Sequence, residues 1–293
     1  MSHFFLTLPS NSSEKFYPEN TMTHFKTKLH NDVSLSGEWE VALYEIIFSY
    51  SVYNVGKDEK LTISCDDCRG YSPPQDDDRL KFRYDLEIPI QYGYYPNIHA
   101  LLTEINRTIN ARFSTSIPLS TTVSRGDTTV YKTINHDARV RFGQTMIQRK
   151  TYISLPANCT VTMSTDMSQI LGFRQTTVEN KGSITFQHDS DTINDLNSIY
   201  SVMYVYCDLL EYVLVGDTAV PLLKIFDAGD ESQRFGTVHR RFEKPMYVPV
   251  QKKNFDAVEI RIKDAFARDI PFEAGNLVAI LHFRKAQETY FLK

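Results

Sequence analysis

The chain has 293 residues, a hydrophobic content of 42% and a net charge of −4. That content is enough to fill the core of one large domain or two ordinary ones, so the chain is not in the disordered class. The weak negative net charge does not provide the excess of basic residues that general nucleic-acid binding requires, and this disfavours that function. Aromatic residues at 12%, with 12 Gly and 12 Pro, are typical of many short strands.

The N-terminal segment has no basic region before its short apolar patch, and no 18 apolar residues occur in a row. We therefore expect neither a signal peptide nor a membrane span. Four cysteines are too few for a disulfide scaffold in a chain of this length, which favours synthesis in a reducing, intracellular compartment.

The first part of the chain predicts strands. We expect them at residues 25–29, 38–53 and 60–65, with the first two joined around Ser36 and Gly37. The second strand is apolar on both faces for part of its length, which is typical of a strand covered on two sides. The acidic, proline-containing run of residues 65–78 then breaks the periodicity, and we place the first domain boundary at its end, residue 78.

The middle of the chain mixes strands with helices. Apolar and charged residues alternate over 82–90, and a helix is predicted over 98–109 behind Pro96 and Asn97. A second helical turn over 168–171 is stopped by Gly172. Further short strands are expected at residues 129–134, 138–147, 150–155, 159–163 and 183–188. Residues 79–190 therefore predict an α+β domain of ordinary size.

The last part returns to strands. Residues 200–209 have apolar side chains in both alternating sets, which predicts a central strand covered on two faces. Gly216 and Asp217 provide a turn before a returning strand at 219–226. We expect this central strand to pair with residues 39–48 and with residues 277–283, which are again apolar on both faces. Residues 247–250 indicate an edge strand because of Pro249, and 258–262 indicate a strand with one wet face.

The predicted fold is mainly β. It is a β-sandwich formed by residues 1–78 and 191–293, with the α+β domain of residues 79–190 inserted into it.

Signatures of catalysis are absent: there is no G-x-S-x-G, no P-loop, no H-E-x-x-H and no G-x-G-x-x-G. The histidines are scattered, so we expect no enzyme activity, no cofactor and no metal site. Cys65 and Cys68 have the spacing of half a zinc site or a redox pair, but Cys159 and Cys207 are isolated in the sequence. Two incidental loop cysteines are the favoured interpretation, and the acidic run 76–78 is interpreted as a solvated loop rather than a calcium site.

Two basic clusters are candidates for phosphate contact. The first alternates with apolar residues, as on the wet face of a strand, and nearby acids offset the second, so nucleic-acid contact is not favoured for either. The clusters are Arg139, Arg141, Arg149 and Lys150, and Arg234, His239, Arg240, Arg241 and Lys244.

The order and spacing of several short motifs across nearly the whole chain carry a family resemblance. The motif residues are Gly37, Trp39, Gly172, Phe173, Tyr206, Asp208, Gly216, Asp217, Pro221, Leu222, Pro249, Phe272, His282 and Phe283. With these residues the chain resembles the minor (penton) capsid proteins of Polinton, or Maverick, viruses and transposons and of the related adintoviruses and virophages.

The resemblance implies a single jelly-roll β-sandwich whose homopentamer occupies the five-fold vertices of an icosahedral virion, beside the major capsid protein, with the inserted domain outward. The two β flanks hold strands for one jelly roll, whereas a major capsid protein of this lineage needs two. An alternative function is a host receptor- or glycan-binding module carried on the sandwich. The sequence shows no diagnostic pocket for such a ligand.

Overall fold

The computed structural model describes residues 2–66, 82–114, 117–123, 126–132, 139–228 and 235–286. The chain divides into two compact units, one formed by Met1–Val52 with Tyr200–Lys293 and the other by Tyr53–Ile199. Cys68, the acidic run 76–78 and Arg234, which the sequence analysis singled out, lie outside the described residues.

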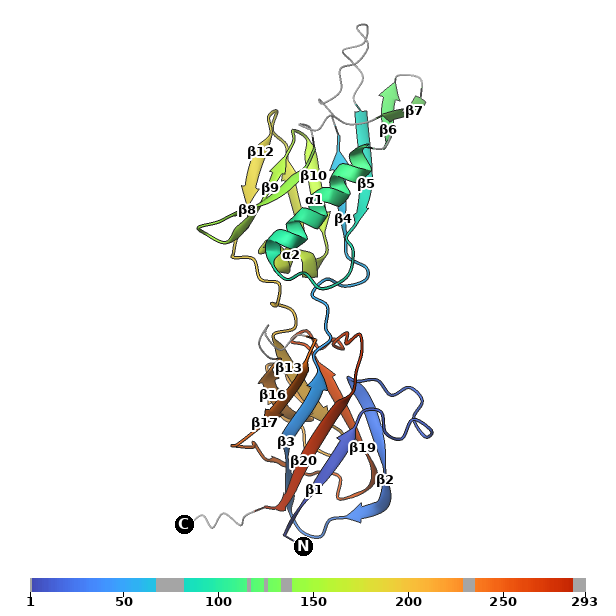
Figure 1. The fold of residues 1–293 in the computed structure, drawn as a ribbon, viewed down its shortest axis with the longest axis vertical. Coiled ribbons are helices and arrows are strands. Elements are labelled where there is room, and N and C mark those ends of the chain that lie inside the picture. Colours follow the sequence, from blue (N-terminus) through green and yellow to red (C-terminus); the bar gives the residue numbers. More distant parts are fainter. Residues whose placement is uncertain are drawn as a thin grey trace. The chain divides into compact units, whose positions relative to one another are not determined.

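In the part of the first unit that the structure describes, two large antiparallel sheets form the architecture (Figure 1). One sheet has the order β1 (His3–Pro9), β20 (Leu277–Lys285), β3 (Trp39–Ser49) and β17 (Thr237–Arg241), with the short β18 (Val248–Pro249) also paired to β3. The other has the order β16 (Leu222–Asp227), β13 (Val202–Cys207), β19 (Asn254–Lys263) and β2 (His24–Ser34).

The strand order of these sheets defines the architecture. Among the described residues, and leaving aside β18 and the small β14–β15 hairpin (Val213–Val215, Thr218–Val220), we number the strands of this unit one to eight along the chain. The sheets then have the orders 1-8-3-6 and 5-4-7-2. This is the order of a jelly roll, in which two Greek keys form a double sheet. The excursion into the second unit leaves after the third strand and returns before the fourth.

The core lies between the two sheets. On β19, Val258, Ile260 and Ile262 are buried and alternate with the partly or fully exposed Glu259 and Arg261, which confirms the predicted strand with one wet face. Aromatic rings join the sheets across this core: Phe255 lies 6.1 Å from Phe283 between ring centroids, and Phe226 lies 6.3 Å from Phe48. The sandwich is therefore held by apolar rows that each sheet turns toward the other.

The strand β13 differs from its prediction in two respects. Its position is central, between β16 and β19, as expected. However, Met203, Val205 and Cys207 are buried whereas Tyr204 and Tyr206 are only partly buried, so the prediction that both faces are covered is wrong. The predicted partners are also wrong, because β3 and β20 pair with each other in the opposite sheet. Apolar periodicity marks a strand as part of the core but does not say in which layer it lies.

The first strand, β1, was not predicted from its short apolar run. Its residues alternate: Leu8 is buried and Phe4 and Leu6 pack on the core, whereas His3 and Phe5 are exposed. β1 is antiparallel to β20, so the first and last strands of the first unit lie side by side.

Among its described residues, the second unit contains a six-stranded sheet, a three-stranded sheet and two helices, α1 (Ile98–Ser114) and α2 (Thr165–Leu171) (Figure 1). The larger sheet has the order β11 (Thr177–Asn180), β10 (Cys159–Met163), β4 (Lys60–Cys65), β5 (Phe82–Pro89), β6 (Ile117–Val123) and β7 (Gly126–Lys132). The smaller has the order β12 (Phe186–Asp189), β9 (Lys150–Leu155) and β8 (Arg141–Thr145). The sequence analysis placed β4 with the sandwich, whereas it pairs here with β5 and β10.

Both predicted helices are present, and their ends follow from local capping. The Asn97 side chain accepts a hydrogen bond from the Ala100 amide at 2.9 Å, and α1 turns one apolar face inward as the predicted spacing requires. Ser164 accepts the Met167 amide at 2.9 Å at the start of α2. Gly172 ends α2 at φ 85°, a left-handed conformation that favours glycine.

Replacing Gly172 with alanine is expected to destabilise the second unit, because the new Cβ would lie 2.5 Å from the Thr192 carbonyl oxygen in addition to the left-handed strain. The two penalties together should lower the free energy of unfolding by about 2–4 kcal/mol. Urea denaturation followed by circular dichroism measures this change.

The matched control is Gly37→Ala, at the same φ of 85° but with no atom within 4 Å of the new Cβ. It should cost only about 1–2 kcal/mol, from backbone strain alone. Equal losses for the two variants would contradict the steric part of the argument.

Candidate functional site

The outer face of the β1-β20-β3-β17 sheet carries a cluster of rings, which we call the aromatic face: His3, Phe5, Tyr44, Tyr247 and His282. Phe5 on β1 and His282 on β20 are direct cross-strand partners, so their side chains share one side of the sheet. The opposite side of the same strands, with Leu281 and Phe283, is buried in the core. The cluster therefore lies on the face turned away from the sandwich interior.

The rings of the aromatic face pack closely on one another. Phe5 stacks on His282 with centroids 4.5 Å apart, and Tyr44 meets the Phe5 ring edge-on at 5.0 Å. His3 and Tyr247 lie 5.4 Å and 5.8 Å from His282 in tilted or edge-on contacts. Such offset and edge-to-face geometries stabilise aromatic pairs and fix the rings in place. The surface is thus preorganised rather than a set of independent side chains.

Polar atoms of the aromatic face are directed at one another. The Tyr247 hydroxyl lies 2.7 Å from Nδ1 of His282, whose Nε2 lies 3.3 Å from Nδ1 of His3. The Arg284 guanidinium lies 3.4 Å from the centre of the Tyr247 ring and pairs with Glu40. Partial burial, together with the nearby His3 and Arg284, lowers the pKa of His282. Neutral His282 is the form that this environment favours.

The apolar surface continues beyond the rings. Ile47 on β3 and its cross-strand neighbour Val278 on β20 are only partly buried, as is Ile280. Phe5 is 50% exposed. The sequence predicted that strands 39–48 and 277–283 are apolar on both faces; in the structure one face forms the core and the other is left partly open to solvent. A shallow hollow of about 670 Å³ lies beside Phe5, Tyr44 and His282.

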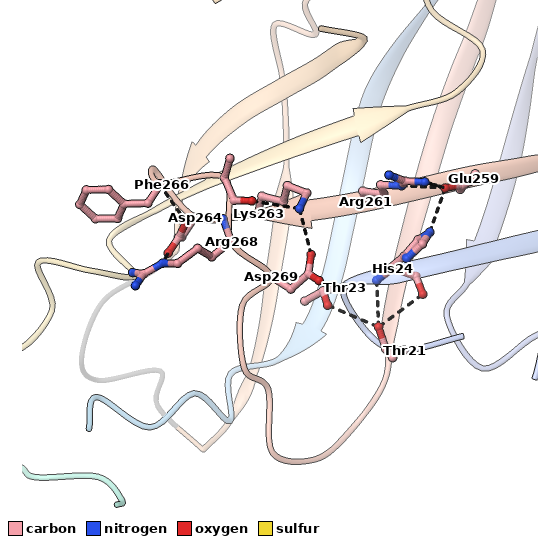
Figure 2. Close-up of polar contacts among 11 residues, drawn as sticks. Thr21, Thr23, His24, Glu259, Arg261, Lys263, Asp264, Phe266, Arg268 and Asp269 are labelled. Carbon is pink, nitrogen blue, oxygen red and sulfur yellow. Dashed lines mark hydrogen bonds and ion pairs between the residues drawn. The ribbon is translucent and has the colours of Figure 1, made fainter. Parts of the chain in front are cut away.

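The outer face of the β16-β13-β19-β2 sheet carries charged and polar side chains, including His24, Glu259 and Arg261, and we call it the polar face (Figure 2). Glu259 on β19 accepts hydrogen bonds from His24 at 2.8 Å and from Arg261 at 2.6 Å. Partial burial opposes ionisation of Glu259, but the bonds from Arg261 and His24 outweigh it and lower the pKa of the carboxyl group. Lys263 pairs with Asp269 at 3.3 Å. The charges of the polar face are largely compensated within the chain.

The turn after β19 depends on a buried carboxylate. Asp264 is 1% exposed, and it accepts the backbone amides of Phe266 and Arg268 at 2.8 and 2.9 Å (Figure 2). Nε of Arg268 donates to the same carboxylate at 2.9 Å. These bonds close the turn, so Asp264 has a structural role.

A groove of about 470 Å³ lies on the polar face, lined in part by Tyr206, Asp208, Tyr212 and Glu259. Its carboxylates already have partners, since Asp208 accepts the Glu259 amide at 2.8 Å and lies 3.4 Å from Lys252. The groove is therefore a weaker candidate for a binding surface than the aromatic face.

Most of the motif residues support the fold instead of converging on a site. Trp39, Leu222, Phe283 and Phe173 are buried. Gly37, Gly172 and Gly216 have positive φ at turns or caps, and Asp217 follows Gly216 in the β14–β15 turn. The Pro221 and Pro249 carbonyls accept the Cys207 and Glu211 amides, and Phe272 packs against Phe48.

Three motif residues lie on the outer faces: Tyr206 and Asp208 line the groove of the polar face, and His282 lies at the centre of the aromatic face. Sequence reasoning missed His3, Phe5, Tyr44 and Tyr247. Residues 3–6 are His, Phe, Phe and Leu, so the sequence shows no polar–apolar alternation there, and only the burial pattern of β1 separates Phe5 from Phe4.

The interpretation of Cys65 as an incidental loop cysteine is wrong. Cys65 is the last residue of β4, is 2% exposed, and lies opposite Cys159 of β10. Cys207 is buried in the core of the first unit.

The basic clusters are partly engaged within the chain. Arg139 donates to the side chain of Asn110 at 3.2 Å, Arg240 pairs with Asp227 at 2.9 Å, and His239 pairs with Glu45 at 2.5 Å. These contacts leave the clusters as weak candidates for phosphate binding.

In the part of the chain that the structure describes, no group of three or more His, Cys, Asp or Glu side chains is placed to hold a metal ion. None of the described helices combines the length and the apolar character required to cross a membrane.

Comparison with known proteins finds similar solved structures. No family model and no curated protein matches the sequence. Among solved structures, the chain is similar to the mavirus penton protein, with 12% sequence identity and a TM-score of 0.47 over 98% of this chain and 100% of that one. A likeness at this level assigns no activity or partner to the chain.

The stability of the first unit is expected to fall on acidification. Because the pKa of His282 is lowered in the folded state, the unfolded chain binds a proton near pH 6.5 that the folded chain binds more weakly. The stabilisation is therefore present above pH 6.5 and declines as the pH falls through 6.5 toward the lowered folded pKa. His282→Gln, which cannot ionise, should reduce the decline in thermal midpoint between pH 7.5 and 5.

The control for this experiment is His99→Gln, at an exposed histidine on α1 of the other unit. It should leave the pH dependence as in the parent chain. An unchanged decline in the His282→Gln variant would show that His282 is not the responsible group.

Proposed function

We propose that this chain is a structural minor capsid protein of the Polinton type, five copies of which form a ring at the five-fold vertices of an icosahedral virion. The neighbouring partner is the major capsid protein, and the chain is made inside the host cell and located in the virion. It performs no catalysis and requires no cofactor. The motif resemblance and the single jelly roll support this role, because one jelly roll is what a penton of this lineage requires.

The observation that carries the proposal is the aromatic face. A jelly roll that functions alone has no need of an outer sheet face with stacked Phe5 and His282 beside partly exposed aliphatic residues. Patches of this kind are typical of protein interfaces, where aromatic residues are enriched at the buried centre. Covering the face with a second copy removes it from water.

The geometry of a closed ring fits such a surface. In a ring, each subunit applies one surface to a different surface of the next subunit, so a single apolar face on each copy is sufficient. Stable contacts of this kind often bury more than about 2,000 Å² in total. The aromatic face extends over β1, β20 and β3, which gives the contact a broad base.

A second candidate function is attachment to a host receptor or glycan through the second unit. Met146 and Ile147, in the turn between β8 and β9, are 85% and 99% exposed, which favours a contact surface there. Cell-binding by the full chain, compared with a Met146→Ser/Ile147→Ser double variant, tests this candidate. Equal binding by the two proteins would remove the turn from consideration.

The ring has a direct test in solution. Analytical ultracentrifugation of the full chain at high concentration and varied salt is expected to show a species of about 169 kDa, five times 33.8 kDa. Phe5→Asp should shift the distribution toward 33.8 kDa. Loss of a central aromatic contact typically costs at least about 2 kcal/mol, and the introduced charge adds a desolvation penalty.

The matched control is Ile147→Asp, which introduces the same charge at an exposed apolar position of the second unit. It should leave the ring intact. A parent chain that stays at 33.8 kDa in every condition counts against self-assembly, and equal masses for the Phe5→Asp and parent chains exclude the aromatic face as the contact.

A further inference from the structure

Cys65 and Cys159, 94 positions apart in the sequence, are direct cross-strand partners on β4 and β10. The Asp66 amide donates to the Asn158 carbonyl at 3.1 Å, immediately beside this pair, whereas the Cys159 amide donates to Pro156. In an antiparallel ladder, this pattern identifies Cys65 and Cys159 as a non-hydrogen-bonded pair. Side chains approach one another most closely at such pairs, whose Cα atoms lie about 4.5 Å apart.

The two thiols lie in a closed environment. The Cys65 thiol lies 3.9 Å from the Ala157 carbonyl oxygen, and the Tyr84 hydroxyl lies 3.9 Å from the Cys159 sulfur. Cys65 and Cys159 are 2% and 1% exposed. The adjacent Cys65 side chain and burial both raise the pKa of the Cys159 thiol. In the closed structure Cys159 is therefore held as a thiol and not as a reactive thiolate.

We propose that Cys65 and Cys159 are an oxidative modification site, at which the two thiols close an intrachain disulfide that ties β4 to β10. A Cα separation of about 4.5 Å lies at the lower end of the range that disulfides span, about 4.4–6.8 Å. The placement on adjacent strands lets the bond form with little movement of the backbone. The site is independent of the capsid role and stands on the register of the two strands.

The chemistry is a two-step exchange with a small-molecule disulfide such as oxidised glutathione. One cysteine loses its proton to water, and its thiolate attacks a sulfur of the small disulfide, forming a mixed disulfide and releasing one glutathione thiolate, which takes up a proton. The second cysteine, deprotonated in the same way, attacks the protein sulfur of the mixed disulfide and releases the second glutathione. The two protein thiols are oxidised, and one glutathione disulfide is reduced to two thiols.

Access to the thiols sets the rate of this exchange. Cys65 is the final residue of β4, so opening the end of that strand exposes the pair without unfolding the sheet. Oxidation is therefore slow in the closed protein and faster under conditions that loosen strand ends. A chain made in a reducing compartment keeps both thiols, and one transferred to oxidising surroundings forms the bond.

The test uses the full chain incubated with oxidised glutathione, with and without low urea. Peptide mapping without reduction is expected to recover a peptide pair joined through Cys65 and Cys159, formed faster in urea. The oxidised protein should show a thermal midpoint higher by roughly 5–10 °C for the transition of the second unit, because the bond closes a long loop. Reduction should restore the original midpoint.

A matched variant isolates the pair. Because the chain has four cysteines, Cys68→Ser combined with Cys207→Ala leaves only Cys65 and Cys159, and this variant should cross-link as the parent does. Adding Cys159→Ser should abolish the bond. Recovery of a Cys65–Cys68 bond in place of the Cys65–Cys159 bond in the parent, or failure of the two-cysteine variant to oxidise in urea, would overturn the assignment.

Discussion

The packing of β3 and β20 against the opposite sheet is the constraint on which the rest of the structure depends. Phe48 and Phe283 from one sheet meet Phe226 and Phe255 from the other, and these contacts close the sandwich core. Because each sheet has only one face in that core, its other face is available for contacts outside the sandwich. This arrangement determines which side chains lie on the outer faces and where the chain leaves for the second unit.

The sequence predicts single elements better than their pairing. The alternation of Val258, Glu259 and Ile260 identifies β19 and its wet face, and Asn97 and Gly172 mark helix ends because capping is local. Partners are non-local: β13, β3 and β20 share the same apolar, β-branched character, so nothing in their composition separates the two layers. The first boundary was placed at a change of periodicity near residue 78, whereas β4 already pairs within the second unit.

The candidate functional surfaces were less accessible to prediction from the sequence. Apolarity on both faces of β3 and β20 was visible, but whether a second layer of the same chain covers the outer face depends on the whole topology. The Cys65 and Cys159 pair likewise depends on the topology of the whole chain. It exists only because β4 and β10, 94 positions apart at these residues, are brought together in one register. Spacing in the sequence therefore directed attention to Cys68 instead.

The register of β1 on β20 links the core to the aromatic face. With Phe5 opposite His282 and Leu8 opposite Ala279, Leu8 points inward and Phe5 points outward. A slip of one residue would exchange these faces, placing Phe5 in a core without space for it and leaving Leu8 in solvent.

The two outer faces also differ in the free energy needed to cover them. Burying the paired charges of Glu259 and Arg261 requires desolvation, whereas covering Phe5 releases about 25 cal/mol per Å². A partner protein that covers one of the two outer faces therefore gains more free energy at the aromatic face, and β20, which closes the core, also positions that face.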